Sequence, residues 1–164
     1  MAITFSMDEI FAMAERIERN GVTFYRKAAE GVSDTEFKKI FEELIEMELD
    51  HVKTFAAMRA EFTGSERLPA VFDPDDEVGM YLQAMADGRV FDIQADPSKK
   101  LTGSETPQDI LNMAIELEKD SIIFYLGLEE YVPAESGKDK VRAIIKQEMG
   151  HIALLDDKLK MLIQ

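Results

Sequence analysis

The sequence predicts an all-α protein, a four-helix bundle with a long crossover between its second and third helices. Apolar residues recur at helical spacing in both end regions of the chain, capping motifs open three of these segments, and the alternation typical of strands is scarce. At 164 residues the chain is long enough for one sizeable hydrophobic core, and its length gives little reason for two. We therefore expect a single domain over residues 1–164.

The first two helices are expected at about residues 6–30 and 33–62. Each opens with the pattern of a capping box, "SMDE" in the first and "SDTE" in the second, in which a serine precedes a glutamate by three positions. Apolar residues at helical spacing follow in both segments. The run "TGSERLP" at 63–69 is rich in helix-breaking residues and should end the second helix.

The last two helices are expected at about residues 107–131 and 137–163. Thr106 is placed to cap the third, with Pro107 in the first helical position. The connection between the two helical pairs, residues 63–105, contains "DDEVGMYLQAMADG", which predicts a short helix at about 75–87. A crossover of this length lets both pairs pack antiparallel around one core.

The two halves of the chain repeat each other with a shift of 100 positions. The segment "MAERIERNGVTFY" at 13–25 aligns with "MAIELEKDSIIFY" at 113–125, and "ELDH" at 48–51 aligns with "EMGH" at 148–151. The chain has only two histidines, and both fall in this second pair of motifs. Duplication of a helical hairpin could preserve such a pattern for packing reasons alone, but the matched histidines favour a functional interpretation.

The repeated residues have the chemistry of a metal site. In a Glu-x-x-His motif on a helix, both side chains project from neighbouring points of one face and can bind the same ion. Two such motifs, together with one glutamate from each of the other two helices, form the dinuclear carboxylate arrangement of four-helix bundles. The predicted metal ligands are Glu18, Glu48, His51, Glu118, Glu148 and His151.

The charges of this set favour a filled site. Four carboxylates balance two divalent ions if the imidazoles are neutral, whereas an empty site would crowd four carboxylates into a core. Oxygen-rich coordination with one nitrogen per metal suits iron or manganese better than zinc. We expect two iron ions per chain, with manganese as the alternative.

Smaller signals surround the predicted ligands. Tyr25 and Tyr125 lie two turns beyond Glu18 and Glu118, where they either hydrogen-bond a ligand carboxylate or the bound oxidant, or fill the core. The small residues nearby either leave room for metal or peroxide or serve helix packing. They are Gly21, Ser121 and Gly150.

Composition excludes several classes of function. Without cysteine the chain has no disulfide, thiolate zinc site, iron–sulfur cluster or thiol nucleophile. A net charge of −14 argues against a nucleic-acid partner, which requires a basic surface. No apolar run is long enough to cross a bilayer, and the first residues do not have the pattern of a signal peptide. We therefore expect a cytoplasmic protein with no membrane partner.

These motifs resemble the ferritin-like superfamily, and most closely its rubrerythrin-type diiron-carboxylate domains. The resemblance rests on the two glutamates, the "ELDH" and "EMGH" motifs, the repeated "FY" pairs and the crossover segment "YLQAMADGRVFD". It implies a ferritin-like antiparallel bundle in which Glu48 and Glu148 bridge two irons. The same resemblance makes Glu18 and Glu118 terminal ligands, and gives each iron one of the two histidines.

The resemblance also implies an activity. Family members reduce hydrogen peroxide or oxidise ferrous iron, so we expect an oxidoreductase acting on peroxide or oxygen, in a homodimer. Two departures from typical rubrerythrins matter. The chain lacks the cysteine-ligated rubredoxin domain, so electrons would come from an external donor such as a rubredoxin. Ser121 stands where typical rubrerythrins have an additional glutamate ligand, which makes the site more symmetric, as in bacterioferritin-like ferroxidase centres.

Three other interpretations of the sequence stay open. The first is a ferroxidase or an iron-binding or iron-storage protein, and the second is a dimanganese, catalase-like enzyme. The third is a bundle with a purely structural role. The sequence also leaves open whether the crossover at 63–105 gates the site or only covers the bundle.

Overall fold

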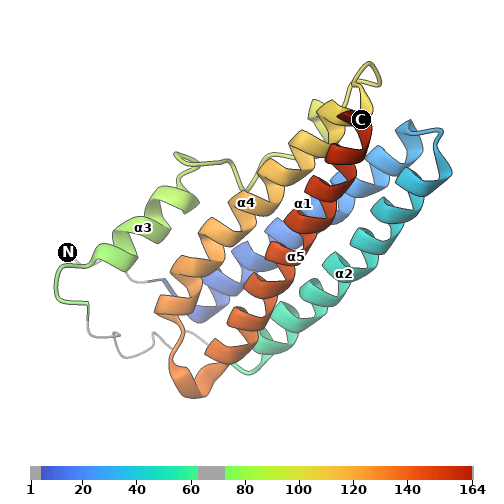
Figure 1. The fold of residues 1–164 in the computed structure, drawn as a ribbon. Helices are drawn as coiled ribbons and strands as arrows, with labels where there is room; N and C mark the ends of the chain where they lie inside the picture. The colour runs from blue at the N-terminus through green and yellow to red at the C-terminus, as the bar shows by residue number, and fades with distance from the viewer. Residues whose placement is uncertain (1–4, 63–72, 164) are drawn as a thin grey trace.

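Four long antiparallel helices form the bundle, and a short helix lies against one side of it (Figure 1). The computed structural model describes residues 5–62 and 73–163. The long helices are α1 (Met7–Gly31), α2 (Thr35–Ala60), α4 (Pro107–Tyr131) and α5 (Lys138–Ile163). The described residues contain no strand, so the predicted all-α bundle with a long crossover is confirmed.

Capping side chains fix where α1, α2 and α4 begin. The predicted capping box is present at Ser6, and Thr106, predicted as a cap, also forms a capping box; each hydroxyl accepts the amide of the third helical residue. The prediction for α2 was wrong by one residue, because Asp34 rather than Ser33 is the cap. The Asp34 carboxylate accepts the amides of Glu36 and Phe37, so it satisfies two free amides where a serine hydroxyl would satisfy one.

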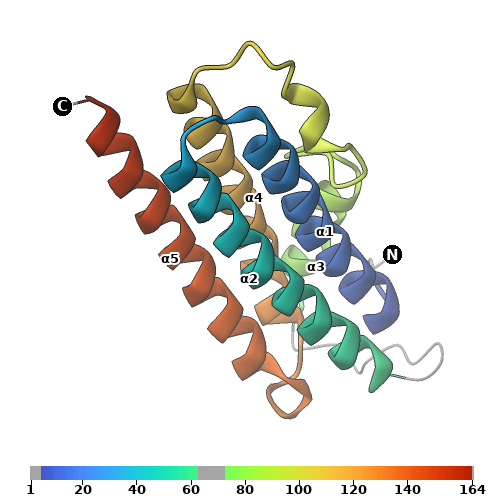
Figure 2. The ribbon, with the colours of Figure 1, turned by 90° about the vertical axis from the view of Figure 1, so that its right-hand side faces the viewer.

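The crossover contains α3 (Glu77–Ala86) and a single 3₁₀ turn, η1 (Pro97–Lys100). The predicted short helix at 75–87 is therefore present in slightly shorter form, whereas the predicted helix-breaking run at 63–69 lies outside the described residues. Helix α3 packs against α4, and η1 packs against α1 (Figures 1 and 2). Helices α1 and α4 belong to different halves of the chain, so the crossover covers the side of the bundle where the two halves meet.

The core consists of two apolar clusters with a polar layer between them. One cluster contains residues 7–17 of α1 and 124–128 of α4, and the other contains residues 24–29 of α1 and 110–114 of α4. The buried polar residues of the long helices lie between these segments on every helix. The bundle therefore places its charged groups at mid-height, with apolar packing on both sides.

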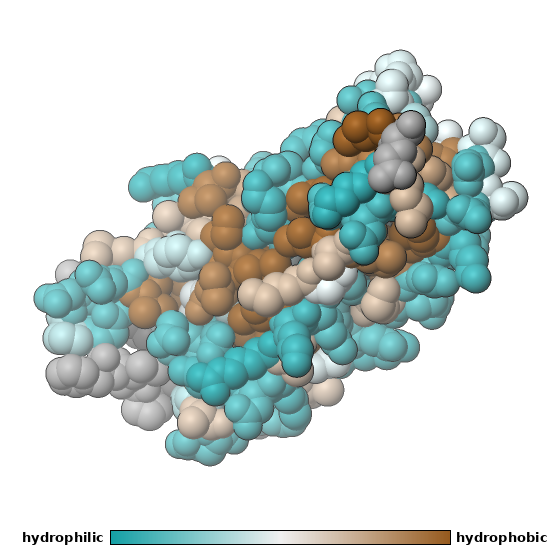
Figure 3. Space-filling model, viewed as in Figure 1, coloured by the Kyte–Doolittle hydropathy of each residue, from teal (hydrophilic) through white to brown (hydrophobic). Residues whose placement is uncertain are grey.

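The surface of the bundle is mostly hydrophilic. Figure 3 shows one face, on which apolar side chains gather over α4 and are bordered by hydrophilic ones. Leu126, on this helix, is about half exposed. Among the described residues, no helix is both long enough and apolar enough to cross a membrane.

Candidate metal centre

The six predicted ligands converge in the polar layer. Helices α1 and α4 each contribute one glutamate, and α2 and α5 each contribute a Glu-x-x-His motif. All six side chains are buried, with at most 4% of any residue exposed. Charged residues are almost never buried to this degree unless they are paired or bind a metal. The group comprises Glu18, Glu48, His51, Glu118, Glu148 and His151.

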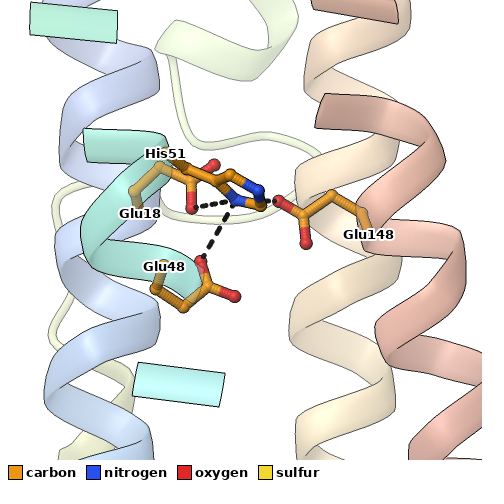
Figure 4. A group of neighbouring side chains, drawn as sticks. All are labelled: Glu18, Glu48, His51 and Glu148. Atoms are coloured by element: carbon orange, nitrogen blue, oxygen red, sulfur yellow. Dashed lines mark hydrogen bonds and ion pairs between the residues drawn. The ribbon is translucent and has the colours of Figure 1, made fainter. Parts of the chain in front are cut away.

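These residues form two overlapping groups. In each group the candidate ligand atoms all lie within 4.8 Å of one another. The first group is Glu18, Glu48, His51 and Glu148, whose side chains point toward one another from α1, α2 and α5 (Figure 4). The second is Glu48, Glu118, Glu148 and His151. Since Glu48 and Glu148 belong to both groups, they stand where carboxylates that bridge two ions would stand.

Both imidazoles turn the same nitrogen toward the carboxylates. His51 Nδ1 lies 3.1 Å from Glu148 Oε1 and 3.3 Å from Glu18 Oε2. His151 Nδ1 lies 2.9 Å from Glu148 Oε2 and 3.4 Å from Glu118 Oε2. The two rings are nearly parallel, with 5.7 Å between their centroids. Nδ1 is therefore the candidate ligand atom on both histidines.

The crowding of carboxylates changes their protonation. Burial raises the pKa of Glu48 well above its usual value, and the negative charge of Glu18 adds to the rise. Burial and the charge of Glu148 raise the pKa of Glu118 to about 8, although the imidazole of His151, 3.4 Å away, opposes them. Without a cation, the layer therefore holds protons that exposed glutamates would release at neutral pH.

The neighbouring carboxylates also raise the pKa of both histidines. Burial by itself disfavours the imidazolium form of His51, but the carboxylates of Glu148 and Glu18 outweigh it and raise its pKa to about 11. The same competition, with Glu118 as the main partner, raises the pKa of His151 to about 9. Both imidazoles thus supply positive charge that a metal ion would supply in their place.

Several buried atoms of this layer have no hydrogen-bond partner within residues 5–62 and 73–163. They are Glu48 Oε1, both carboxylate oxygens of Glu148, and both ring nitrogens of His151. An unpaired buried polar atom costs about 1–3 kcal/mol, and more when it is charged. All except one of these atoms face the shared space at the centre of the group. The donor set therefore fits divalent cations with oxygen-rich coordination.

Two tyrosines tie the halves of the chain together around the site. The Tyr25 hydroxyl of α1 donates to a carboxylate oxygen of Glu118 on α4, and the Tyr125 hydroxyl of α4 donates to one of Glu18 on α1. Burial, followed by the charge of the accepting glutamate, raises the pKa of both tyrosines, so they remain protonated donors. The sequence left open whether these tyrosines hydrogen-bond a ligand carboxylate or the oxidant, or fill the core. In the structure, each hydrogen-bonds the carboxylate of a predicted ligand.

One contact of the site was missed at the level of sequence. Gln147 Oε1 lies 2.7 Å from Nε2 of His51, the nitrogen that faces away from the carboxylates. The signal was present in the repeat, since the shift of 100 positions aligns Gln147 with Met47, a residue of different chemistry. Such a mismatch directly beside a matched ligand marks a place where the two halves differ.

A cavity of about 150 Å³ reaches the site between α1 and α4. Its wall includes Glu48, Glu118 and the small residues Gly21 and Ser121, together with several crossover residues between positions 91 and 100. A Cβ added to Gly21 would lie 3.2 Å from Glu48 Oε2, so the glycine leaves room beside this carboxylate. Two of the three predicted small residues therefore line a space next to the ligands.

The third small residue does not. Gly150 is exposed, and a Cβ added to it would meet no atom within 4 Å among the described residues. Its position next to His151 in the sequence was misleading, because neighbouring residues of a helix point in directions about 100° apart. The prediction that Gly150 leaves room for metal or peroxide, or for helix packing, is wrong.

Comparisons with known proteins agree with this geometry. The rubrerythrin family model matches residues 9–88, which include Glu18, Glu48 and His51. The chain is similar to a crystal structure from Thermotoga maritima described as "a putative ferritin-like diiron-carboxylate protein", with a TM-score of 0.72, 26% identity and 98% of each chain covered. No curated protein matches the sequence.

The fold and the site together define a ferritin-like four-helix protein with a buried Glu/His cluster suited to metal binding. More narrowly, the part of the chain that contains α1, α2 and α3 matches the rubrerythrin family model, and the similar crystal structure is described as a diiron-carboxylate protein. The candidate ligands of α4 and α5 lie beyond residue 88, outside the family match, and they are identified by the internal repeat and by the geometry of the site.

Proposed function

We propose that this protein is a non-haem diiron oxidoreductase that reduces hydrogen peroxide, or oxygen, with electrons from an external donor. The observation that carries the proposal is the pair of overlapping ligand groups that share Glu48 and Glu148. When bound, two ferrous ions would supply a Lewis acid and two electrons for the O–O bond. The overall reaction consumes peroxide, two electrons and two protons and yields two waters.

The residues of the chain have separate roles in this proposal. Glu48 and Glu148 would each contribute ligand atoms to both ions, while each remaining glutamate and histidine would bind one ion. Tyr25 and Tyr125 would orient the terminal carboxylates through their hydrogen bonds, because groups that fix a ligand's orientation influence metal affinity. The apolar clusters on both sides of the layer would keep water away from most of the site.

The size of the cavity is consistent with a small oxidant as the substrate. A water molecule occupies about 30 Å³ of liquid volume, so a cavity of about 150 Å³ has room for a few molecules of that size. Peroxide and oxygen are both small enough to enter it. Through Glu48 and Glu118, the cavity reaches one shared and one terminal ligand, as access to both ions requires.

The electron donor belongs outside the chain. With no cysteine, the chain has no thiolate iron site that could pass electrons inward. A rubredoxin is the kind of donor proposed, and a homodimer is the proposed assembly. Ser121 gives reason to keep a second function, that of a ferroxidase or iron-storage protein, because it leaves the two metal positions with equal numbers of ligands.

Anaerobic loading with iron tests the proposal. The metal-free protein is titrated with Fe(II), the bound iron is counted per chain, and one equivalent of peroxide or of oxygen is then mixed in while oxidation is followed by absorbance. We expect two irons per chain and much faster oxidation by peroxide. Gly150→Ala is the matched control, since it changes an exposed residue adjacent to a ligand in sequence and should behave as the wild type.

Each other outcome points to a different function. Faster oxidation by oxygen, with iron uptake continuing beyond two per chain, would favour the ferroxidase or storage protein. Release of oxygen from peroxide by the manganese-loaded protein alone would favour a catalase-like enzyme. Failure to bind two metals in the wild type would refute the dinuclear site itself.

A further inference from the structure

The two histidines are alike at Nδ1 and differ at Nε2. Nε2 of His51 is 2.7 Å from Gln147 Oε1. Nε2 of His151 is buried and has no hydrogen-bond partner among residues 5–62 and 73–163. Because both imidazoles turn Nδ1 toward the carboxylates, the difference lies on the side of each ring that faces away from the candidate metal positions.

The internal repeat explains this difference. Gln147 directly precedes Glu148 on α5 and reaches across to the histidine of α2. The corresponding residue on α2, directly before Glu48, is Met47. An amide oxygen accepts a hydrogen bond strongly, whereas a thioether sulfur is a weak acceptor. One substitution between the halves therefore gives a hydrogen-bond acceptor to His51 alone.

An acceptor at Nε2 changes what Nδ1 can do. If Nδ1 binds a metal, the neutral ring carries its proton on Nε2, and a carbonyl oxygen that accepts this proton fixes the tautomer and the ring orientation. It also makes Nδ1 a stronger donor to the metal. His51 has these advantages, and His151 lacks them.

The two positions are alike in their candidate ligands and in the tyrosines that contact them. Both share Glu48 and Glu148. Each terminal glutamate accepts a hydrogen bond from one buried tyrosine of the opposite half. Each histidine lies three residues after a shared glutamate on its own helix. Gln147 is therefore the feature that distinguishes the hydrogen bonding of the His51 ring from that of the His151 ring.

We propose that Gln147 is a positioning residue that makes the metal position beside His51 and Glu18 bind divalent cations more tightly than the position beside His151 and Glu118. The two positions then fill in order, and the ion beside His151 is the one that exchanges. This inference rests on the dinuclear site of the proposed function. It adds a specific order of filling and names the residue that sets it.

Cobalt(II) binding to single-position variants tests the inference. His151→Ala leaves the position beside His51 intact, and His51→Ala leaves the position beside His151 intact. We expect the dissociation constant for cobalt, measured by absorbance or calorimetry, to be about 10-fold lower in His151→Ala, the lower end of the effect of such outer contacts. Circular dichroism confirms that each variant is folded.

Exchanging the two residues provides the matched controls. Adding Gln147→Met to His151→Ala should raise its dissociation constant about 10-fold, whereas adding it to His51→Ala should change nothing. Adding Met47→Gln to His51→Ala should lower its dissociation constant, without effect in His151→Ala. Gln147→Glu retains an acceptor and should retain tight binding. A role of Gln147 in helix packing alone would not produce this pattern, because it would not depend on which histidine is present.

The wild type separates failure of this inference from failure of the proposed function. Two cobalt ions per chain with equal affinities, unaffected by Gln147→Met, would overturn the order of filling and leave the dinuclear site standing. Fewer than two cobalt ions per chain in the wild type would overturn both. If a histidine variant does not fold, the two-step titration of the wild type against Gln147→Met decides the question by itself.

Discussion

The hairpin of α1 and α2 and the hairpin of α4 and α5 carry the same candidate ligands in different surroundings. Each supplies one glutamate from its first helix and a Glu-x-x-His motif from its second. Each also sends a tyrosine to the glutamate of the other hairpin. The residues beside the ligands differ, however, with Met47 aligned to Gln147 and Gly21 aligned to Ser121. The repeat thus specifies which groups meet, and the neighbours of those groups make the two positions unequal.

The crossover adds a second source of asymmetry. It has no counterpart elsewhere in the repeat, and it places η1 on α1 but α3 on α4. Several of its residues between positions 91 and 100 line the cavity on the side where α1 and α4 meet, so the candidate site has a covered approach there. The imidazoles come instead from α2 and α5. The cavity therefore reaches the site on the side of α1 and α4, whereas the histidines are positioned by α2 and α5.

Removal of a shared carboxylate should have the largest effect, because it affects both hairpins at once. Glu148→Ala is expected to abolish stoichiometric binding of both ions, and Glu48→Ala should do the same from the other hairpin. Glu18→Ala, which removes a terminal ligand, should retain one ion. The measurement is the metal content per chain after anaerobic loading and removal of free ions. Two ions retained by Glu148→Ala would contradict the sharing of this residue.

Metal removal should have the next largest effect, measured as a fall in Tm. A ligand at 100 times its Kd stabilises a fold by about 2.7 kcal/mol, which for a chain of this size corresponds to about 5–10 °C. We expect verified removal of metal by a chelator to lower the Tm of the wild type by this amount near neutral pH. Glu148→Ala should show no such fall, and an unchanged wild-type Tm would argue against a buried site.

The similarity of the hairpins could be predicted from sequence, because the helical spacing of apolar residues and the internal repeat both extend over long segments. A shift of 100 positions aligns the candidate ligands in the sequence, and the same residues lie in one buried layer. The helix starts at Ser6 and Thr106 followed equally from local capping chemistry. These features depend on residues close in sequence or on strict repetition.

The differences between the hairpins were harder to predict, because they depend on side-chain direction and on contacts across the bundle. The contact between His51 and Gln147 joins residues 96 positions apart, so the sequence around either residue does not indicate it. Gly150 was misplaced because a helical neighbour of a ligand need not face the ligand. The cap of α2 was misassigned because Ser33 and Asp34 compete for one role, and only the backbone geometry decides between them.

The two tyrosines provide a test of equivalence between the hairpins. Tyr25→Phe and Tyr125→Phe each leave a buried carboxylate without its hydroxyl donor, so each should lower the free energy of unfolding of the metal-free protein by about 1–3 kcal/mol. The two losses should be equal within error in urea titrations. Phe24→Leu, a change in the apolar cluster beside Tyr25, controls for loss of packing alone. Clearly unequal losses would show that the tyrosines have different roles.

Alanine substitutions of Gly21 and Gly150 should distinguish a glycine that faces the site from one that faces solvent. Gly150→Ala adds a methyl group in open space, so the gain in helix propensity should raise the free energy of unfolding by about 0.5–1 kcal/mol. Gly21→Ala has the same intrinsic gain, but its methyl group would lie 3.2 Å from Glu48 Oε2. We expect a smaller net gain there, together with weaker cobalt binding. Equal stabilisation by both substitutions, with unchanged cobalt binding, would remove Gly21 from the site.

The smallest expected effect concerns the residue before each capping box. Glu105 precedes Thr106 and accepts hydrogen bonds from the backbone amides of Thr102 and Gly103, whereas the corresponding residue before Ser6 is Phe5. The amide and hydroxyl of Thr102, which donate to the carboxylate, lower the pKa of Glu105 to about 2.

A carboxyl group whose pKa is lowered by folding contributes stability above its unfolded value, and this contribution is lost as the pH falls through the folded value. Glu105→Gln should therefore flatten the acid limb of the stability curve between about pH 4.5 and pH 2 and change little elsewhere. NMR titration of the Glu105 carboxyl carbon measures the pKa directly. A normal value would mean that the start of α4 depends on Thr106 and Asp109 alone, as the start of α1 depends on its own capping box.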